Sequence, residues 1–185
     1  MTKPEDCAAL IALAIEKYGR VDILVNNAGV GTAVPATKET PDEYRSVIET
    51  NLMGSYWMAQ EFAKANKDGG AIVNISSVLG LRPQGLPQAA YASSKAGVIG
   101  LTRDLAAQWT GRKKIRVNAL APGFFPSEMS DELPKDMVEM IKMFTPAGRL
   151  GDPEELAATL IWLVSDASSY VTGITVPVDG GLVMP

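Results

Sequence analysis

Two side chains with acid and base chemistry, Tyr91 and Lys95, lie four positions apart in the sequence. Residues four apart on a helix share one face, so these two side chains can meet if the segment is helical. Ser77 precedes the same segment and follows an apolar run. The spacing alone is weak evidence for a site. It is strengthened by the location of Ser77 just after a predicted strand and of Tyr91 and Lys95 at the head of the next predicted helix.

A tyrosine beside a lysine can serve as an acid and a base near neutral pH if its pKa falls far enough. A free phenol has a pKa near 10, so a depression of about 3 units, or roughly 4 kcal/mol, is needed. An ammonium group about 5 Å away supplies roughly 3 kcal/mol at an effective dielectric constant near 20. The positive ring of an oxidised nicotinamide can supply the rest, which favours hydride chemistry on an alcohol. Ser77 could then hydrogen-bond the substrate oxygen while the proton moves.

The composition excludes several other kinds of chemistry. The sequence has no histidine and one cysteine, which rules out imidazole-based triads, nearly all zinc sites and redox cysteine pairs. The net charge of -4 gives no electrostatic reason to expect nucleic acid or an acidic membrane as a partner. The early apolar run at 7–15 is about half of a membrane span and lacks a basic leader. We therefore expect a soluble, cytoplasmic protein suited to small-molecule chemistry or protein contact.

The elements that must position these residues alternate between helix and strand. Apolar runs of buried-strand type occur at 22–26, 71–76, 115–120 and 174–178, and helical patterns occur at 4–19, 41–67, 91–110 and 153–164. Strands that are apolar on both faces and separated by helices predict a doubly wound, Rossmann-like parallel α/β sheet in one domain over residues 1–185. Ligands bind such sheets at the carboxyl ends of the strands.

Two further strand ends carry candidate residues. The segment Asn27-Ala28-Gly29 follows the first strand, where its small residues either let the backbone approach a ligand or form an ordinary turn. Pro122-Gly123 follows the third strand and leads into a Met-rich stretch within 127–148. We interpret that stretch as a substrate lid, with an amphipathic helix packed on the core as an equal alternative.

Taken together, these motifs resemble the short-chain dehydrogenase/reductase family. The resemblance rests on Asn26-Asn27-Ala28-Gly29, Asn51, Ser77, Tyr91-x-x-x-Lys95, Pro122-Gly123 and Val178-Asp179-Gly180-Gly181, which follow the family's order across the chain. It implies an oxidoreductase that uses NAD or NADP and transfers a hydride to or from a secondary alcohol or ketone. It also implies a homodimer or homotetramer, packed through the helices at 41–67 and 91–110.

The resemblance assigns a role to each candidate residue. It implies that Tyr91 is the catalytic acid and base, and that Lys95 holds the nicotinamide ribose while lowering the pKa of Tyr91. Asn51 would join them in a proton relay, a role compatible with a helix bend at that position. Ser77 rather than its neighbour Ser76 would polarise the substrate oxygen, because Ser77 leads into a Val-x-Gly stretch. The implied cofactor contacts are Asn27, Ala28 and Gly29 on the adenosine side, and Pro122, Gly123 and Ser127 at the nicotinamide amide.

One feature of the family is missing from the sequence. Its members open with a strand and a T-G-x-x-x-G-x-G turn, and no such spacing occurs here. We hypothesise that the chain is N-terminally truncated, or that Met1 is an internal methionine, with about four strands remaining and 22–26 as an uncovered apolar edge. Upstream codons that encode no such strand and turn would contradict the second version. The alternative function is a catalytically silent fragment that acts as a subunit or interaction module.

Overall fold

The computed structural model describes residues 2–126 and 135–184, and the structural statements below concern these residues. They form a parallel sheet whose four strands lie side by side in chain order. The strands are β1 (Ile23–Asn26), β2 (Gly70–Ile75), β3 (Ile115–Pro122) and β4 (Thr175–Val178). The predicted parallel α/β fold is confirmed.

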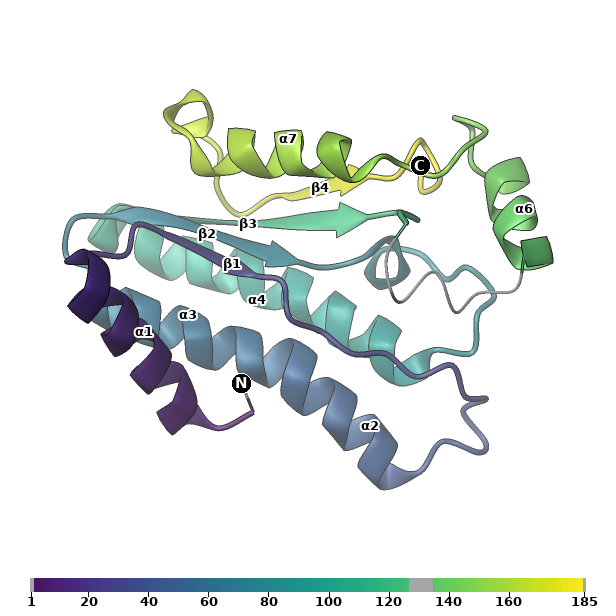
Figure 1. The fold of residues 1–185 in the computed structure, drawn as a ribbon, viewed down its shortest axis with the longest axis horizontal. Coiled ribbons are helices and arrows are strands. Elements are labelled where there is room, and N and C mark those ends of the chain that lie inside the picture. Colours follow the sequence, from purple (N-terminus) through teal and green to yellow (C-terminus); the bar gives the residue numbers. More distant parts are fainter. Residues whose placement is uncertain (1, 127–134, 185) are drawn as a thin grey trace.

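Helices cover both faces of this sheet, as the doubly wound prediction requires (Figure 1). On one face lie α1 (Pro4–Tyr18), α3 (Gly54–Ala65) and α4 (Ala89–Lys113), with α2 (Pro41–Ile48) leading into α3. On the other face lies α7 (Pro153–Val164), and α6 (Lys135–Phe144) stands beyond the carboxyl end of the sheet. Two short 3₁₀ turns, Val78–Gly80 and Asp166–Ser168, and a π-helical turn, Glu49–Met53, complete the described elements. Among the described residues, no helix is both long and apolar enough to cross a membrane.

Local chemistry fixes where the functional helices start. The Thr40 side chain caps α2, and the Thr40 amide donates a hydrogen bond to the Glu43 carboxylate. Pro41 occupies the first turn. Asp152 caps α7 in the same way, with Pro153 in the first turn. In each case a side-chain oxygen satisfies an amide that has no partner within the helix.

The core lies on both sides of the two central strands. Ile72 packs with Phe62 and Val117 on the side of α3 and α4, whereas its neighbour Val73 packs with Leu163 on the side of α7. Successive residues of a strand point to opposite faces, so a strand buried on both faces is mostly apolar. This arrangement explains the composition of β2 and β3, in which Asn74, Arg116 and Asn118 are the polar exceptions.

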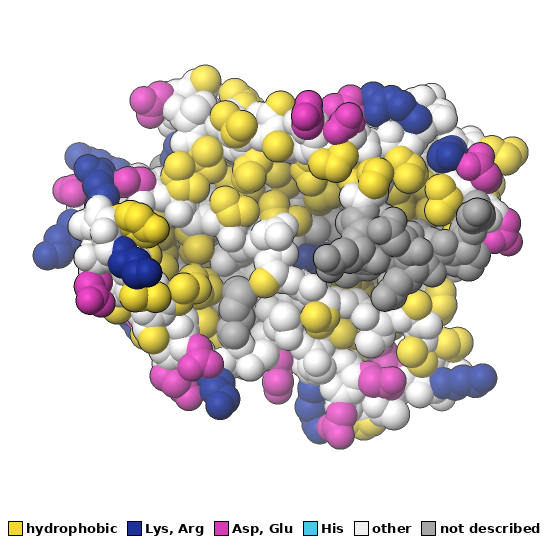
Figure 2. Space-filling model, in the orientation of Figure 1, with side chains coloured by type: hydrophobic (Ala, Val, Ile, Leu, Met, Phe, Trp, Pro, Cys, Tyr) yellow, Lys and Arg dark blue, Asp and Glu magenta, His cyan; other side chains and the backbone are white. Residues whose placement is uncertain are grey.

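The strand β1 forms an uncovered edge of the sheet in the described residues. Leu24 points into the core, but Ile23 and Val25 are 47% and 36% exposed. On the face that carries α7, no helix of the described residues lies above β1 (Figure 1). Hydrophobic side chains gather over the strands there (Figure 2). The expectation of an apolar edge at 22–26 is confirmed.

Two predicted helices differ from expectation. The stretch at 41–67 is interrupted between α2 and α3 by a π-helical turn, Glu49–Met53, and α3 ends at Ala65. In α6 the buried side chain is Ile141, while Met140 and Met143 are 47% and 84% exposed. Met140 and Met143 therefore do not pack on the core, whereas Met137 is half-buried. Met129 lies outside the described residues.

Candidate active site

A cavity of about 140 Å³ opens at the carboxyl ends of β1, β2 and β3. Because these strands are parallel, the segments that follow them meet at one edge of the sheet. The cavity is lined by Asn27, Gly29, Ile75, Ser76, Ser77, Tyr91, Lys95, Pro122 and Gly123. Most of the residues singled out from the sequence are thus brought together, from segments that lie far apart in the chain.

The two serines after β2 have different tasks. Ser76 is buried, and its hydroxyl donates to the Lys95 carbonyl at 2.8 Å, so it ties β2 to α4. The Ser77 hydroxyl accepts from the Leu79 amide at 3.2 Å and forms a hydrogen bond with the Tyr91 side chain. This difference supports the choice of Ser77 over Ser76 as the residue that faces the reacting atoms.

Lys95 holds its charged end inside the protein. The residue is 4% exposed, and its Nζ donates to the Ile75 carbonyl at 2.7 Å. The same atom lies 5.5 Å from the centroid of the Tyr91 ring. Burial disfavours the charged form and lowers the pKa of Lys95 to about 8.

The Tyr91 hydroxyl does not show the acidity that the sequence led us to expect. Burial raises the pKa of Tyr91 above its ordinary value, and the hydrogen bond from Ser77 opposes that rise. The expected depression by Lys95 is wrong for the site in this structure. The reason is that desolvation acts on both groups, while the Lys95 ammonium donates to a backbone carbonyl.

Asn51 braces the site through its side-chain amide. It lies 1% exposed in the π-helical turn, which matches the helix bend foreseen at this position. Its Oδ1 accepts from the Val30 amide and its Nδ2 donates to the Val30 carbonyl, both at 2.8 Å. The same Nδ2 donates to Ser94 Oγ at 3.0 Å, and Ser94 donates to the Tyr91 carbonyl.

Sequence reasoning missed Val30 and Ser94. Val30 takes part only through its backbone, which no sequence pattern marks. Ser94 offered a signal, since it lies three residues after Tyr91 on the same helix face and is a buried serine in a long helix. Through these two residues, Asn51 fixes the loop after β1 against the first turns of α4.

Glycines let this loop lie directly against the reactive side chains. A methyl group added to Gly29 would lie 3.2 Å from Asn51 Oδ1 and 3.4 Å from Lys95 Nζ. One added to Gly31 would lie 3.2 Å from Tyr91 Cδ2. Of the predicted cofactor contacts here, Asn27 and Gly29 line the cavity, and Ala28 is exposed between them.

Pro122 and Gly123 form the opposite wall. The Gly123 amide donates to the Val178 carbonyl at 2.9 Å, and a methyl group on Gly123 would lie 2.8 Å from Asp179 Cα. The turn at Asp179-Gly180-Gly181 is held in place because the Asp179 carboxylate accepts from the amides of Gly181 and Val183. The predicted contact Ser127 lies outside the described residues.

The size and donors of the cavity fit one end of a dinucleotide. Pockets that enclose a drug-sized ligand measure about 300–1,000 Å³, so a space of about 140 Å³ suits a nicotinamide ring and a small reacting group. The Lys95 ammonium and the Tyr91 and Ser77 hydroxyls supply donors in that space. Gly29 and Gly123 leave it open where side chains would intrude.

Known proteins resemble the chain along its whole length. A family model described as enoyl-(acyl carrier protein) reductase matches residues 1–183. The chain is 41% identical to the 3-oxoacyl-[acyl-carrier-protein] reductase FabG of Thermotoga maritima, over all of the chain and 75% of that relative. A short-chain type dehydrogenase/reductase from Mycobacterium marinum has a TM-score of 0.94 and 32% identity, covering 100% of this chain and 73% of its own.

A second solved structure adds a ligand to the comparison. The gluconate 5-dehydrogenase of Burkholderia cenocepacia J2315, in complex with NADP and tartrate, has a TM-score of 0.93 and 36% identity. The match covers 98% of this chain and 72% of that one. The chain therefore spans about three quarters of the length of these proteins.

Proposed function

Since the chain belongs to the short-chain dehydrogenase/reductase family, we propose that it transfers a hydride between NAD(P) and a secondary alcohol or ketone, with Tyr91 as the acid and base. It is an NAD(P)-dependent oxidoreductase that acts on CH–OH or keto groups. One observation carries the proposal: Ser77, Tyr91 and Lys95 converge on a single cavity at the carboxyl ends of three strands.

In the proposed reduction, Tyr91 and Ser77 bind the carbonyl oxygen of the substrate. Each hydroxyl has one proton, so a substrate oxygen beside them can accept a hydrogen bond from each once it replaces the bond between Ser77 and Tyr91. A bound reduced nicotinamide supplies the hydride that adds to the carbonyl carbon. The Tyr91 hydroxyl gives its proton to the oxygen, which forms the alcohol and leaves a phenolate. The Lys95 ammonium, 5.5 Å from the ring centroid, stabilises that phenolate until a proton from solvent replaces the one transferred.

The protonation state in this structure favours the reductive direction. A raised pKa keeps Tyr91 protonated at neutral pH, which is the form that a general acid needs. Oxidation of an alcohol would need the phenolate instead. We propose that Asn51 takes part in the relay that returns the proton, because its amide links the loop at Val30 to Ser94 beside Tyr91.

The remaining predicted residues would hold the cofactor. We propose that Lys95 binds the nicotinamide ribose and that Pro122, Gly123 and Ser127 bind the nicotinamide amide. Asn27, Ala28 and Gly29 would line its adenosine side. The open cavity wall at Gly123 supports the assignment at the nicotinamide amide.

We also propose a cytoplasmic homodimer or homotetramer. The helical stretch that leads from α2 to α3 leaves Tyr44 and Met53 each 40% exposed, as a packing surface requires. A substrate lid at 127–148 is proposed as well, supported by the exposed Met140 and Met143 of α6.

The alternative is a catalytically silent subunit or interaction module. The exposed apolar side chains of Ile23 and Val25 on the edge strand favour a surface covered by another polypeptide. An interaction module does not depend on a proton donor, whereas the proposed enzyme does. Substitution of Tyr91 should therefore greatly lower the activity of an enzyme and leave the binding by a silent module unchanged.

Isotope transfer tests the proposed function directly. The protein is incubated with NADPH or NADH deuterated at the transferred position, together with a 3-oxoacyl thioester or a keto-gluconate. We expect deuterium on the carbinol carbon of the product, and far less product from Tyr91→Phe. Absence of alcohol with both cofactors and both ketones would contradict the enzymatic function and favour the silent module.

A further inference from the structure

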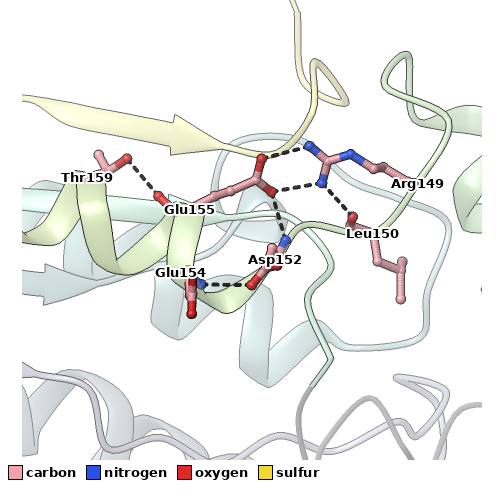
Figure 3. Close-up of polar contacts among 6 residues, drawn as sticks. All are labelled: Arg149, Leu150, Asp152, Glu154, Glu155 and Thr159. Carbon is pink, nitrogen blue, oxygen red and sulfur yellow. Dashed lines mark hydrogen bonds and ion pairs between the residues drawn. The ribbon is translucent and has the colours of Figure 1, made fainter.

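An ion pair at the start of α7 lies outside the cavity but close to its wall. The Arg149 guanidinium grips the Glu155 carboxylate with two hydrogen bonds, Nη1 to Oε2 at 2.8 Å and Nη2 to Oε1 at 2.7 Å (Figure 3). The fork-to-fork geometry makes this the directional kind of ion pair. Nothing in the reaction proposed above uses either residue.

The same two side chains also fasten the backbone between them. Glu155 Oε2 accepts from the Asp152 amide at 2.8 Å, and Arg149 Nη1 donates to the Leu150 carbonyl at 3.1 Å. Figure 3 shows these contacts closing around the turn that enters α7. The bonds from Arg149 and Asp152 also hold the pKa of Glu155 down at about 2, so the carboxylate stays charged at any ordinary pH.

The fastened turn touches the wall of the active site through Gly151. The Gly151 amide donates to the Phe124 carbonyl at 3.0 Å, and a side chain on Gly151 would overlap the Phe125 ring. Phe124 directly follows Gly123, which lines the cavity. The segment 122–125 thus has two backbone tethers, one from Gly123 to Val178 and one from Phe124 to Gly151.

Packing alone does not fix the second tether. A separate cavity of about 130 Å³ lies between the turn and the segment, and Phe124, Arg149, Glu155 and Asp179 are among the residues that line it. Gly151 packs closely on the Phe125 ring, but dispersion contacts do not define the position of the backbone where such a space remains. The hydrogen bonds of Arg149 and Glu155 add to that contact in fixing the turn.

We propose that Arg149 and Glu155 are positioning residues, which hold the cofactor-side wall at Pro122-Gly123 in place through the turn at Gly151. The inference rests on the proposed function for its consequence, since that wall is assigned to the nicotinamide amide. The pair contributes little to folding stability, because the two side chains are 56% and 48% exposed. Its effect is on the geometry of one loop.

The chain offers a matched control for this pair. Arg20 and Asp22 form a second bidentate ion pair, with bonds of 2.7 and 2.9 Å and side chains 67% and 47% exposed. That pair lies before β1, at the opposite end of the strands. The variants Arg149→Met and Arg20→Met therefore remove the same guanidinium from similar pairs at the two ends of the sheet.

Hydrogen exchange, followed residue by residue by NMR without cofactor, tests the proposal. We expect Arg149→Met to speed exchange of the Gly151 and Gly123 amides by about fivefold, since loss of local contacts opens local structure. Arg20→Met should change neither, Arg149→Lys should recover part of the loss, and melting temperatures should stay within about 2 °C. A purely local role would speed exchange at Gly151 alone.

Three results would overturn the proposal. They are an unchanged exchange rate of the Gly123 amide in Arg149→Met, an equal increase in exchange rate in Arg20→Met, and a fall in melting temperature of more than about 2 °C in Arg149→Met, which would mean that the pair stabilises the fold. Fluorescence titration with NADPH gives a second readout, with affinity expected to fall about fivefold in Arg149→Met only. If the unaltered protein does not bind NADPH, the proposed function fails, and the exchange data still decide the positioning role.

Discussion

We expect the buried Lys95 to make the folding stability depend on pH in an unusual way. Its pKa is about 8 in the folded protein, against an ordinary value of 10.5 that applies to the unfolded chain. Between these two values the unfolded chain binds more protons than the folded one, so the free energy of unfolding rises with pH. The rise is about 2 kcal/mol between about pH 7 and about pH 9.5, and it approaches roughly 3 kcal/mol above the unfolded pKa.

The assay compares urea unfolding of the unaltered protein with that of Lys95→Met, which keeps an apolar stem and removes the charge. The free energy of unfolding of the unaltered protein, minus that of the variant, should increase by about 2 kcal/mol between about pH 7 and about pH 9.5. The upper limit stays below the pKa of Tyr91, which burial raises above its ordinary 10.0, so the tyrosine does not titrate in this window.

Lys113→Met is the matched control for that comparison. Lys113 also donates to a backbone carbonyl, that of Ala63 at 2.9 Å, but it is exposed. Its removal shows what the loss of an exposed lysine and its one hydrogen bond does to stability in the same assay. A constant difference between the unaltered protein and Lys95→Met across the pH range would refute the reasoning, because it would mean that burial does not disfavour the ammonium.

Four further outcomes are expected. Thr40→Ala removes a helix cap and should cost about 1 kcal/mol in urea unfolding, and an unchanged midpoint would contradict the capping role. Gly100→Ala, at an exposed α4 position with open space around it, should add about 0.5–1 kcal/mol, whereas a loss would indicate a contact there. Ser77→Ala should lower the rate of ketone reduction about 10²-fold without weakening NADPH binding, and equal rates would remove Ser77 from the site. Since burial raises the pKa of Tyr91, the rate of ketone reduction should stay constant through neutral pH and fall only in the alkaline range. The rate of alcohol oxidation should rise with pH. A rate of reduction that falls at acid pH would contradict this sign.

The fold class and the choice of Ser77, Tyr91 and Lys95 as candidate site residues could be predicted from local sequence patterns. The strands β2 and β3 are mostly apolar because both of their faces are buried, and the spacing of Tyr91 and Lys95 places them on one face of α4. Ser77 was distinguished from Ser76 because it leads into a Val-x-Gly stretch, as the family resemblance implies, and the structure gives the two hydroxyls different partners. These are short-range properties that a sequence carries.

The electrostatics of the site depended on contacts that no local pattern records. Lys95 finds its acceptor at the Ile75 carbonyl, 20 residues away, and that contact comes with the burial that lowers its pKa. The same burial raises the pKa of Tyr91, so the sign of its shift could not be obtained from the distance to one ammonium. The brace from Asn51 to the Val30 backbone likewise requires the loop and the π-helical turn to be placed in space first.

The Met-rich helix shows a limit of a different kind. Helical periodicity groups Met140 and Met143 with apolar positions, yet it does not say whether a core lies opposite them. In α6 the one buried position is Ile141, and the methionines face outward. An exposed stripe and a buried one have the same sequence pattern, so only the position of the helix beyond the sheet distinguishes them.

The central claim is that the Tyr91 hydroxyl delivers the proton in ketone reduction, and a pair of tyrosine variants tests it most directly. Tyr56 is the control, since it is half-buried in α3 and its hydroxyl accepts a hydrogen bond from Gln60 at 3.2 Å. With a 3-oxoacyl thioester and NADPH, we expect Tyr91→Phe to lower the turnover rate by about 10²–10⁴-fold at unchanged NADPH affinity, and Tyr56→Phe to leave it within about twofold. Equal turnover by Tyr91→Phe and the unaltered protein would contradict the account.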